Sequence, residues 1–338
     1  MNSKERCLAA IAGQPVDRVP VFPLLMFLSA DRLGISYRRY ATDGLAMAES
    51  QVNIFRRFGV DAITACSDAY RVSADLGGRM AYPEDQPPHL LHPLVTSAAD
   101  VDHLRRPDPT RRGSRMSDRT QAVREMVKAV GDECLVLGWV DMPFAEACAM
   151  CGVQEFMMLM MDEPEAAHRL LDFLADVVID FCLVQLEAGS PMIGAGDAAA
   201  SLISSEHYRE FALPYEQRIC QAVHDAGGLV KLHICGNTNA LLDDMPQSGA
   251  DLFNVDHMVD LARAVEVYGG AGKCIKGNLN PVTDMFQATP EQCHQQASQC
   301  IATARGHRYM LSAGCEVPAG VSDEVLTAFC SAAHDYGR

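Results

Sequence analysis

Short apolar runs alternate along the chain with longer stretches in which apolar residues recur at three- and four-residue steps. The short runs predict buried strands, and the three-to-four spacing predicts amphipathic helices. Repeated alternation of this kind is typical of βα units, whose strands pair in parallel. The runs that we interpret as strands cover residues 19–24, 62–65, 135–140, 192–194, 230–233, 252–255, 274–277 and 309–311.

The clearest helix is predicted from Pro164 to Glu187. Its apolar stripe consists of Leu170, Leu171, Leu174, Val177, Val178, Phe181 and Val184,. Asp162 is a suitable N-cap ahead of the proline in the first turn, and Gly189 is a suitable stop. A similar pattern predicts another long helix over residues 208–226, which ends at the Gly-Gly pair that follows.

Eight strands with intervening helices predict an α/β fold, a closed (β/α)8 TIM barrel rather than an open doubly wound sheet. No Gly-x-Gly-x-x-Gly turn follows the first predicted strand, which disfavours a dinucleotide-binding fold,. Barrels of this class form one domain at lengths well above 250 residues. We therefore expect a single domain over residues 1–338, with 49% hydrophobic residues to fill its core.

One segment, at about residues 82–115, departs from the alternation and lies between the second and third predicted strands. It contains Pro83, Pro87, Pro88, Pro93, Pro107 and Pro109. Proline lacks a backbone N–H, so most of this insertion is expected to be neither helix nor central strand. It is either a cover beside the active site, which excludes water or docks a partner, or a surface insertion unrelated to turnover.

The formal charge of −16 argues against a nucleic-acid-binding surface and against binding to anionic lipid, both of which need clustered Lys and Arg,. The first residues are charged, and no run approaches the roughly 18 apolar residues of a membrane helix,. We expect a cytoplasmic protein. Its 13 cysteines are then core residues, metal ligands or catalytic groups rather than disulfides,.

A group of soft metal ligands is predicted at the carboxyl ends of two strands, where active sites of such barrels lie. The fifth strand runs into His233-Ile234-Cys235, and residues two apart on an extended backbone point to the same side,. Cys315 follows the eighth strand, 80 residues after Cys235. One imidazole and two thiolates suit Zn²⁺, and three protein ligands leave the fourth position open for catalysis.

Simpler interpretations compete with a metal site. A His-x-Cys at a strand end is usually a packed pair, and Cys315 is what favours the metal. Cys148 and Cys151 form a CxxC of the kind used in redox chemistry,. They lie in an apolar helical stretch without a second CxxC, so we interpret them as core residues.

At these residues the sequence resembles the uroporphyrinogen decarboxylase superfamily, and specifically its zinc branch of methylcobamide:coenzyme M methyltransferases and related corrinoid methyltransferases. The resemblance covers nearly the whole chain. Its motifs are Arg18-Val19-Pro20-Val21, Pro143-Phe144, Asp162-Glu163-Pro164-Glu165, Gly196-Asp197, Leu232-His233-Ile234-Cys235-Gly236-Asn237 and Gly277-Asn278-Leu279-Asn280-Pro281. The His-x-Cys-Gly-Asn motif together with Cys315 is the part specific to the zinc branch.

The resemblance implies that zinc binds at His233, Cys235 and Cys315. It also implies methyl transfer between a cobamide and a zinc-activated thiol such as coenzyme M, or from a methyl ether or thioether in the reverse sense. The 338 residues contain no Asp-x-His-x-x-Gly corrinoid-binding motif. The methylcobamide or cobalamin, bound as a co-substrate, is therefore expected to arrive on a partner corrinoid protein.

The chain departs from the decarboxylases after the first predicted strand. Those enzymes place arginines there that bind the porphyrinogen carboxylates, whereas residues 22–28 are apolar or proline and the first arginine after them is Arg32. Tetrapyrrole decarboxylation is therefore disfavoured, and a metal-free lyase of the decarboxylase type is kept as the alternative.

Five further residues are expected to support the metal site or to bind substrate. Asp256, after the sixth strand, is either the fourth zinc ligand or an N-cap for the next turn. Asp197 is expected to orient a zinc-bound imidazole or the substrate. Asn237, Asn278 and Lys276 are expected to bind substrate, the latter two at an anionic tail, although Lys276 facing solvent is an equal alternative.

Overall fold

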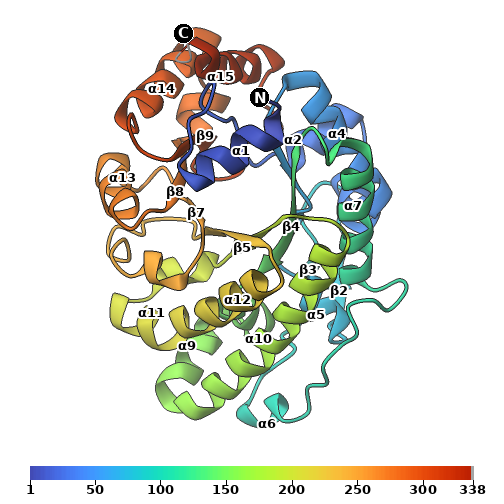
Figure 1. Cartoon of the computed structure of the whole chain (residues 1–338). Helices are drawn as coiled ribbons and strands as arrows, with labels where there is room; N and C mark the ends of the chain where they lie inside the picture. The colour runs from blue at the N-terminus through green and yellow to red at the C-terminus, as the bar shows by residue number, and fades with distance from the viewer. Residues whose placement is uncertain (336–338) are drawn as a thin grey trace.

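The computed structural model describes residues 1–335, and in it seven parallel strands curve around a common axis with helices packed outside them (Figure 1). The strands are hydrogen-bonded in the order β1-β4-β5-β6-β7-β8-β9. They are β1 (Ala62–Thr64), β4 (Leu135–Asp141), β5 (Met192–Gly196), β6 (Leu229–His233), β7 (Leu252–Asn254), β8 (Cys274–Leu279) and β9 (Tyr309–Ala313). These strands confirm seven of the eight predicted runs and the α/β barrel class.

The predicted first strand, residues 19–24, is wrong as a regular strand, although the segment occupies the expected place. Val21 bridges Leu311 of β9 in parallel, and its carbonyl oxygen accepts a 2.7 Å hydrogen bond from the backbone N of Asp61, next to β1. The barrel therefore closes through this segment. Pro20 and Pro23 have no N–H to donate, which prevents a continuous ladder on either side,.

Buried ion pairs replace the missing ladder at this closure. The Asp61 carboxylate is fully buried and accepts hydrogen bonds from Arg6 at 2.6 Å, from Arg18 at 2.7 Å and from the backbone N of Val21 at 2.7 Å. One carboxylate thus joins the N-terminal helix, the closing segment and β1.

Helix α1 (Ser3–Ala12) closes the end of the barrel at which the strands begin. It contacts β1, β4, β8 and β9, and its apolar residues join a cluster built largely from first residues of strands. That cluster includes Cys7, Ala10, Ile11, Ala62, Leu135, Met192, Leu252 and Cys274. The open end, which we call the mouth, is formed by the carboxyl ends of the strands.

The remaining helices and short elements surround the strands or extend their connections. They are α1 (Ser3–Ala12), α2 (Phe27–Leu33), α3 (Tyr37–Thr42), α4 (Gly44–Phe58), α5 (Arg71–Asp75), β2 (Met80–Ala81), β3 (His89–Leu90), α6 (Ala98–Val101), α7 (Arg115–Val130), α8 (Pro143–Cys151), α9 (Val153–Asp162), α10 (Pro164–Glu187), η1 (Ala198–Leu202), α11 (Ser205–Phe211), α12 (Leu213–Asp225), η2 (Met245–Ser248), α13 (Leu261–Gly270), η3 (Pro281–Phe286), α14 (Pro290–Thr303) and α15 (Asp323–Asp335).

Helix α10 has the predicted bounds, but the predicted N-cap is wrong. Asp162 is the last residue of α9, and Glu163 occupies the cap position without a side-chain hydrogen bond. The predicted helix over 208–226 is two helices, α11 and α12, separated at Ala212. Pro214 lies in the first turn of α12 and cannot donate the hydrogen bond that would continue α11,.

The proline-rich insertion begins directly after β2; its residues 82–88 connect β2 to β3, which pairs with β2 in antiparallel over two residues, and the short α6 follows before α7 begins. Beyond the hairpin it packs on the outside of the barrel: Leu94 donates to the carbonyl of Met150 at 2.8 Å, and Arg106 pairs with Asp180 of α10 at 2.5 Å. Its role as a cover stays a prediction. Within residues 1–335 no single helix is long and apolar enough to span a membrane; the pair α8 and α9, bent by 108°, meets the criterion by length and composition only.

Candidate functional site

His233 ends β6 and has a fixed ring orientation at the mouth. Its Nδ1 lies 2.9 Å from the carbonyl oxygen of Asn254 on the neighbouring β7, so Nδ1 carries the donated proton. Its Nε2 faces Cys235 Sγ at 2.9 Å. A histidine held by one ring nitrogen presents the other nitrogen to a metal in the tautomer that binds it.

Cys315 reaches the same place from the loop after β9. Its Sγ lies 3.5 Å from Cys235 Sγ, and the ligand atoms of His233, Cys235 and Cys315 all lie within 4.8 Å of one another. Gly314 permits this approach, since a Cβ there would lie 2.2 Å from the backbone N of His257. The structure therefore brings the three predicted ligands together, and their donor set suits Zn²⁺.

The two thiols are unequal in the absence of a metal. Contact with the Cys235 thiol and the proximity of His233 lower the pKa of Cys315 to about 3, against the effect of burial. The same contact and burial raise the pKa of Cys235. Both cysteines are half-buried, so the cluster is open toward the mouth.

Asp256 caps the turn that follows it, one of its two expected roles, whereas Asp197 lies differently from expectation. Asp256 Oδ1 accepts from the backbone N of Met258 at 3.0 Å and pairs with His257 Nδ1 at 2.8 Å, which is the turn-capping alternative. Its role as a fourth ligand stays a prediction. The expectation that Asp197 orients the imidazole is wrong for Nδ1, whose partner is a backbone carbonyl. Asp197 instead accepts from the backbone N of Ala145 in α8 at 2.8 Å.

Asp197 and Glu216 form a buried acidic pair outside the barrel lumen. Burial and the neighbouring Glu216 raise the pKa of Asp197 well above its usual range. Burial also raises the pKa of Glu216, to about 7, and Glu216 accepts a 2.5 Å hydrogen bond from the hydroxyl of Tyr208. Asp197 is thus part of the packing between α8 and α12 rather than of the group formed by His233, Cys235 and Cys315.

One of the three expected substrate-binding residues is a buried lysine, and the other two are asparagines whose side chains bond within the protein. Lys276 is 1% exposed, so the solvent-facing alternative is wrong; its Nζ lies 3.7 Å from the ring centroid of Phe22. Asn278 Nδ2 donates to the carbonyl oxygens of Asp256 at 3.1 Å and Val259 at 2.9 Å. Asn237 Oδ1 accepts from Asn239 at 2.7 Å. Substrate binding by these three residues stays a prediction.

Sequence reasoning missed a second buried lysine, Lys231, two residues before His233 on β6. It is 1% exposed, and its Nζ lies 4.4 Å from the centroid of the Trp139 ring. Burial lowers the pKa of Lys231 to about 8 and that of Lys276 well below its usual range. The position of Lys231 could have been predicted from the sequence, because positions 231 and 233 point to the same side of one strand.

Cys148 and Cys151 are buried free thiols within α8, packed in the main apolar core. Burial raises the pKa of both, which makes them less reactive than a redox pair requires,. Their interpretation as core residues is confirmed.

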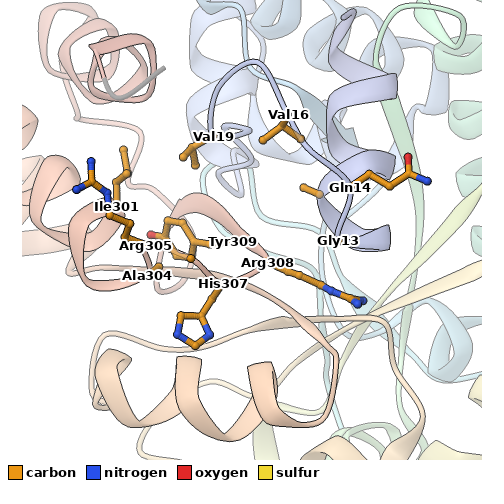
Figure 2. Close-up of a pocket in the computed structure, with 12 residues that line it drawn as sticks. Gly13, Gln14, Val16, Val19, Ile301, Ala304, Arg305, His307, Arg308 and Tyr309 are labelled. Carbon is orange, nitrogen blue, oxygen red and sulfur yellow. The ribbon is translucent and has the colours of Figure 1, made fainter. Parts of the chain in front are cut away.

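Figure 2 shows the residues that line a hollow of about 390 Å³. It lies at the end of the barrel where the strands begin, opposite His233, Cys235 and Cys315. Gly13 and Gln14, which follow α1, line it together with residues that precede or begin β9, including His307, Arg308 and Tyr309. It is separated from the mouth by the closed end of the barrel and is not the catalytic cavity.

Comparisons with known proteins agree with the fold. The family model described as uroporphyrinogen decarboxylase (URO-D) matches residues 2–336. A methyltransferase from Methanosarcina mazei has a solved structure that matches with a TM-score of 0.90 and 21% identity, over 99% of each chain. At that identity the match shows the fold.

Two curated relatives differ in activity. A methylcobamide:CoM methyltransferase from Methanosarcina acetivorans is 27% identical over 98% of this chain and 98% of its own. A uroporphyrinogen decarboxylase from Psychromonas ingrahamii is 26% identical over 98% of this chain and 96% of its own. Overall similarity therefore does not choose between the two activities, and the residues of the site must.

Proposed function

The chain belongs to the uroporphyrinogen decarboxylase family, and we propose that it is a zinc-dependent methyltransferase of that family. It moves a methyl group between a cobamide, carried by a partner corrinoid protein, and a thiol such as coenzyme M. In the reverse sense it removes a methyl group from an ether or thioether. The observation that carries this proposal is the cluster of His233, Cys235 and Cys315 at the barrel mouth.

The donor set favours a thiol substrate. Two sulfurs and one imidazole leave one position of a tetrahedral site free, and a further sulfur completes a soft site. When bound, Zn²⁺ supplies the Lewis acidity that lets a thiol lose its proton near neutral pH, or that draws electrons from an ether oxygen. A relative named for methylcobamide and CoM supports the same substrates.

The chain's own residues orient and balance this site. Asn254 holds the imidazole of His233 through Nδ1, while Lys231 and Lys276 place two amines in the barrel lumen below the cluster. Burial lowers the pKa of both amines, whereas the negative charge of the thiolates raises it, so formation of the anionic site favours their protonated, cationic forms. The corrinoid partner and the substrates would meet at the mouth, in the cytoplasm, where the sulfur can approach the methyl carbon.

A direct assay separates this proposal from a decarboxylase-type lyase without metal. The zinc-loaded protein is mixed with methylcobalamin and a panel of thiols, coenzyme M first, and loss of the methyl–cobalt species is followed by absorbance. Uroporphyrinogen is incubated in parallel with metal-free protein. Methyl transfer to a thiol supports the proposal, whereas consumption of uroporphyrinogen without methyl transfer supports the lyase.

Lys276→Met is expected to weaken binding of an anionic thiol selectively. An anionic tail beside the buried amine favours its protonated form, and the resulting charge-assisted contact contributes roughly 1.5–3 kcal/mol, which corresponds to a KM increase on the order of 10-fold or more for coenzyme M. The KM for the uncharged 2-mercaptoethanol should stay unchanged. Steady-state kinetics with both thiols checks this, and Lys128→Met, on the exposed face of α7, is the matched control. Equal effects on both thiols would remove Lys276 from tail recognition.

A further inference from the structure

A buried group of charged side chains lies at the mouth, and the proposed function assigns no role to it. Asp141 ends β4, Arg71 lies in α5 and Glu146 in α8, and all three are at most 9% exposed. Arg71 donates to Asp141 Oδ2 and to the carbonyl of Asp68. In the described part of the chain, neither carboxyl oxygen of Glu146 has a hydrogen-bond partner.

The strand register places Asp141 beside the metal cluster. Asp141 pairs with Gly196 of β5, and Gly196 pairs with His233 of β6, so the three residues are level. Residues level in parallel strands point to the same face, and neighbouring strands lie about 4.8 Å apart. Asp141 and His233 therefore flank Gly196, which has no side chain to separate them.

The carboxyl group of Asp141 lies over Gly196, where no side chain separates it from His233. A Cβ at Gly196 would lie 3.1 Å from Asp141 Oδ1 and 3.2 Å from the Trp139 ring. Arg71 bonds to Oδ2 of Asp141. The other oxygen, Oδ1, therefore lies over Gly196, on the side of His233. A substrate atom bound at the cluster would thus have this oxygen on one flank.

The charged and titratable surroundings favour proton exchange at this carboxyl. Burial raises the pKa of Asp141 to about 6, against the lowering effect of Arg71, and raises that of Glu146 well above its usual range. A group with a pKa near the working pH can both take and give a proton. The groups that face Asp141 from neighbouring elements are Cys66, Asp68, Tyr70, Arg71, Trp139, Glu146 and Asp197.

We propose that Asp141, backed by Glu146 and held by Arg71, exchanges the proton of the substrate heteroatom at the His233–Cys235–Cys315 cluster. This inference rests on the proposed function. When a thiol docks, its S–H bond breaks, the electron pair stays on sulfur, and the proton forms an O–H bond at Asp141 Oδ1. In the reverse sense the same O–H gives its proton to the leaving sulfur or oxygen.

Three other carboxyls near the cluster each have one oxygen that accepts a hydrogen bond from a backbone N. Asp256 Oδ1 caps its own turn, Asp197 faces α8, and Glu316 Oε1 accepts from the backbone N of Phe27 at 2.8 Å. Asp141 differs because one of its oxygens is turned over a glycine next to His233.

The test counts protons released when coenzyme M binds to the zinc-loaded protein, by titration calorimetry in buffers of different ionisation heat. Near pH 5 Asp141 is already protonated, so the thiol proton goes to solvent and about one proton is released. Above pH 6 Asp141 is ionised and can take the proton, and the negative charge of the thiolate bound beside it raises the pKa of Asp141 in the complex, so that it keeps the proton; release by the wild type should therefore fall below half a proton near pH 7.5,. Asp141→Asn should release about one proton at both pH values.

Two further variants make every result decisive. Asp243→Asn, at an exposed carboxylate, should behave as wild type, and Glu146→Gln should keep the fall in proton release because Asp141 remains. A fall that is lost in Glu146→Gln but kept in Asp141→Asn would overturn the assignment. One proton released by the wild type at both pH values would overturn this inference alone, whereas absence of any thiol binding would contradict the proposed function as well.

Discussion

Replacing Cys235 or Cys315 with alanine is expected to abolish both stoichiometric zinc binding and methyl transfer. Each change removes one of three ligands that the fold brings within 4.8 Å. Loss of a group that merely supports a ligand costs roughly 10- to 100-fold, so loss of a ligand should exceed that range. Elemental analysis of protein purified without chelator, together with the methylcobalamin assay, measures both quantities.

The fold should survive these substitutions. Both cysteines are half-buried and lie in loops, so their truncation leaves no cavity in the core, and the free energy of unfolding should change by less than about 1 kcal/mol,. Cys300→Ala is the matched control, because it is the other half-buried cysteine within residues 1–335 and lies in α14. Retention of one zinc per chain by either ligand variant would contradict the assignment.

Asp61→Ala is expected to destabilise the barrel by roughly 3–5 kcal/mol, because it leaves buried guanidinium groups without their counter-charge. Arg6 and Arg18 both bond to this carboxylate, which also holds the backbone N of Val21. A loss of this size is a large fraction of the roughly 5–15 kcal/mol that stabilises a typical domain. Denaturant unfolding measures it.

An exposed ion pair provides the comparison for Asp61. Arg56 and Glu133 form a two-bonded pair at 2.7 and 2.8 Å, with both side chains about half exposed. Glu133→Gln should leave the denaturant midpoint nearly unchanged, because water and salt screen an exposed ion pair. Equal effects of Asp61→Ala and Glu133→Gln would show that the buried carboxylate does not hold the closure.

Much of the fold could be predicted because buried parallel strands leave continuous apolar runs, and seven of the eight predicted runs became strands. The run at 19–24 has the same apolar composition, but its prolines lack the N–H donors that a continuous strand ladder needs. Hydrogen bonds between the Asp61 carboxylate and two arginines connect this segment instead. Similarly, Pro214 divides a helix whose apolar spacing alone predicts continuity.

The grouping of His233, Cys235 and Cys315 could be predicted because both determinants are local: spacing of two along a strand, and position at a strand's carboxyl end. The partner of His233 could not, because it is a backbone carbonyl of the next strand rather than a carboxylate such as Asp197. The place of Asp141 depends on the register across β4, β5 and β6 and on the missing side chain of Gly196, and neither is visible in one stretch of sequence.

X-ray absorption at the zinc edge tests the central claim, that His233, Cys235 and Cys315 hold a zinc with a position open to substrate. The resting protein should show two sulfur neighbours and a histidine nitrogen, and coenzyme M or the correct thiol should add one sulfur. No bound zinc, or a zinc whose sulfur neighbours stay unchanged with every thiol and whose ligands stay unchanged with every methyl ether tested, would contradict the account.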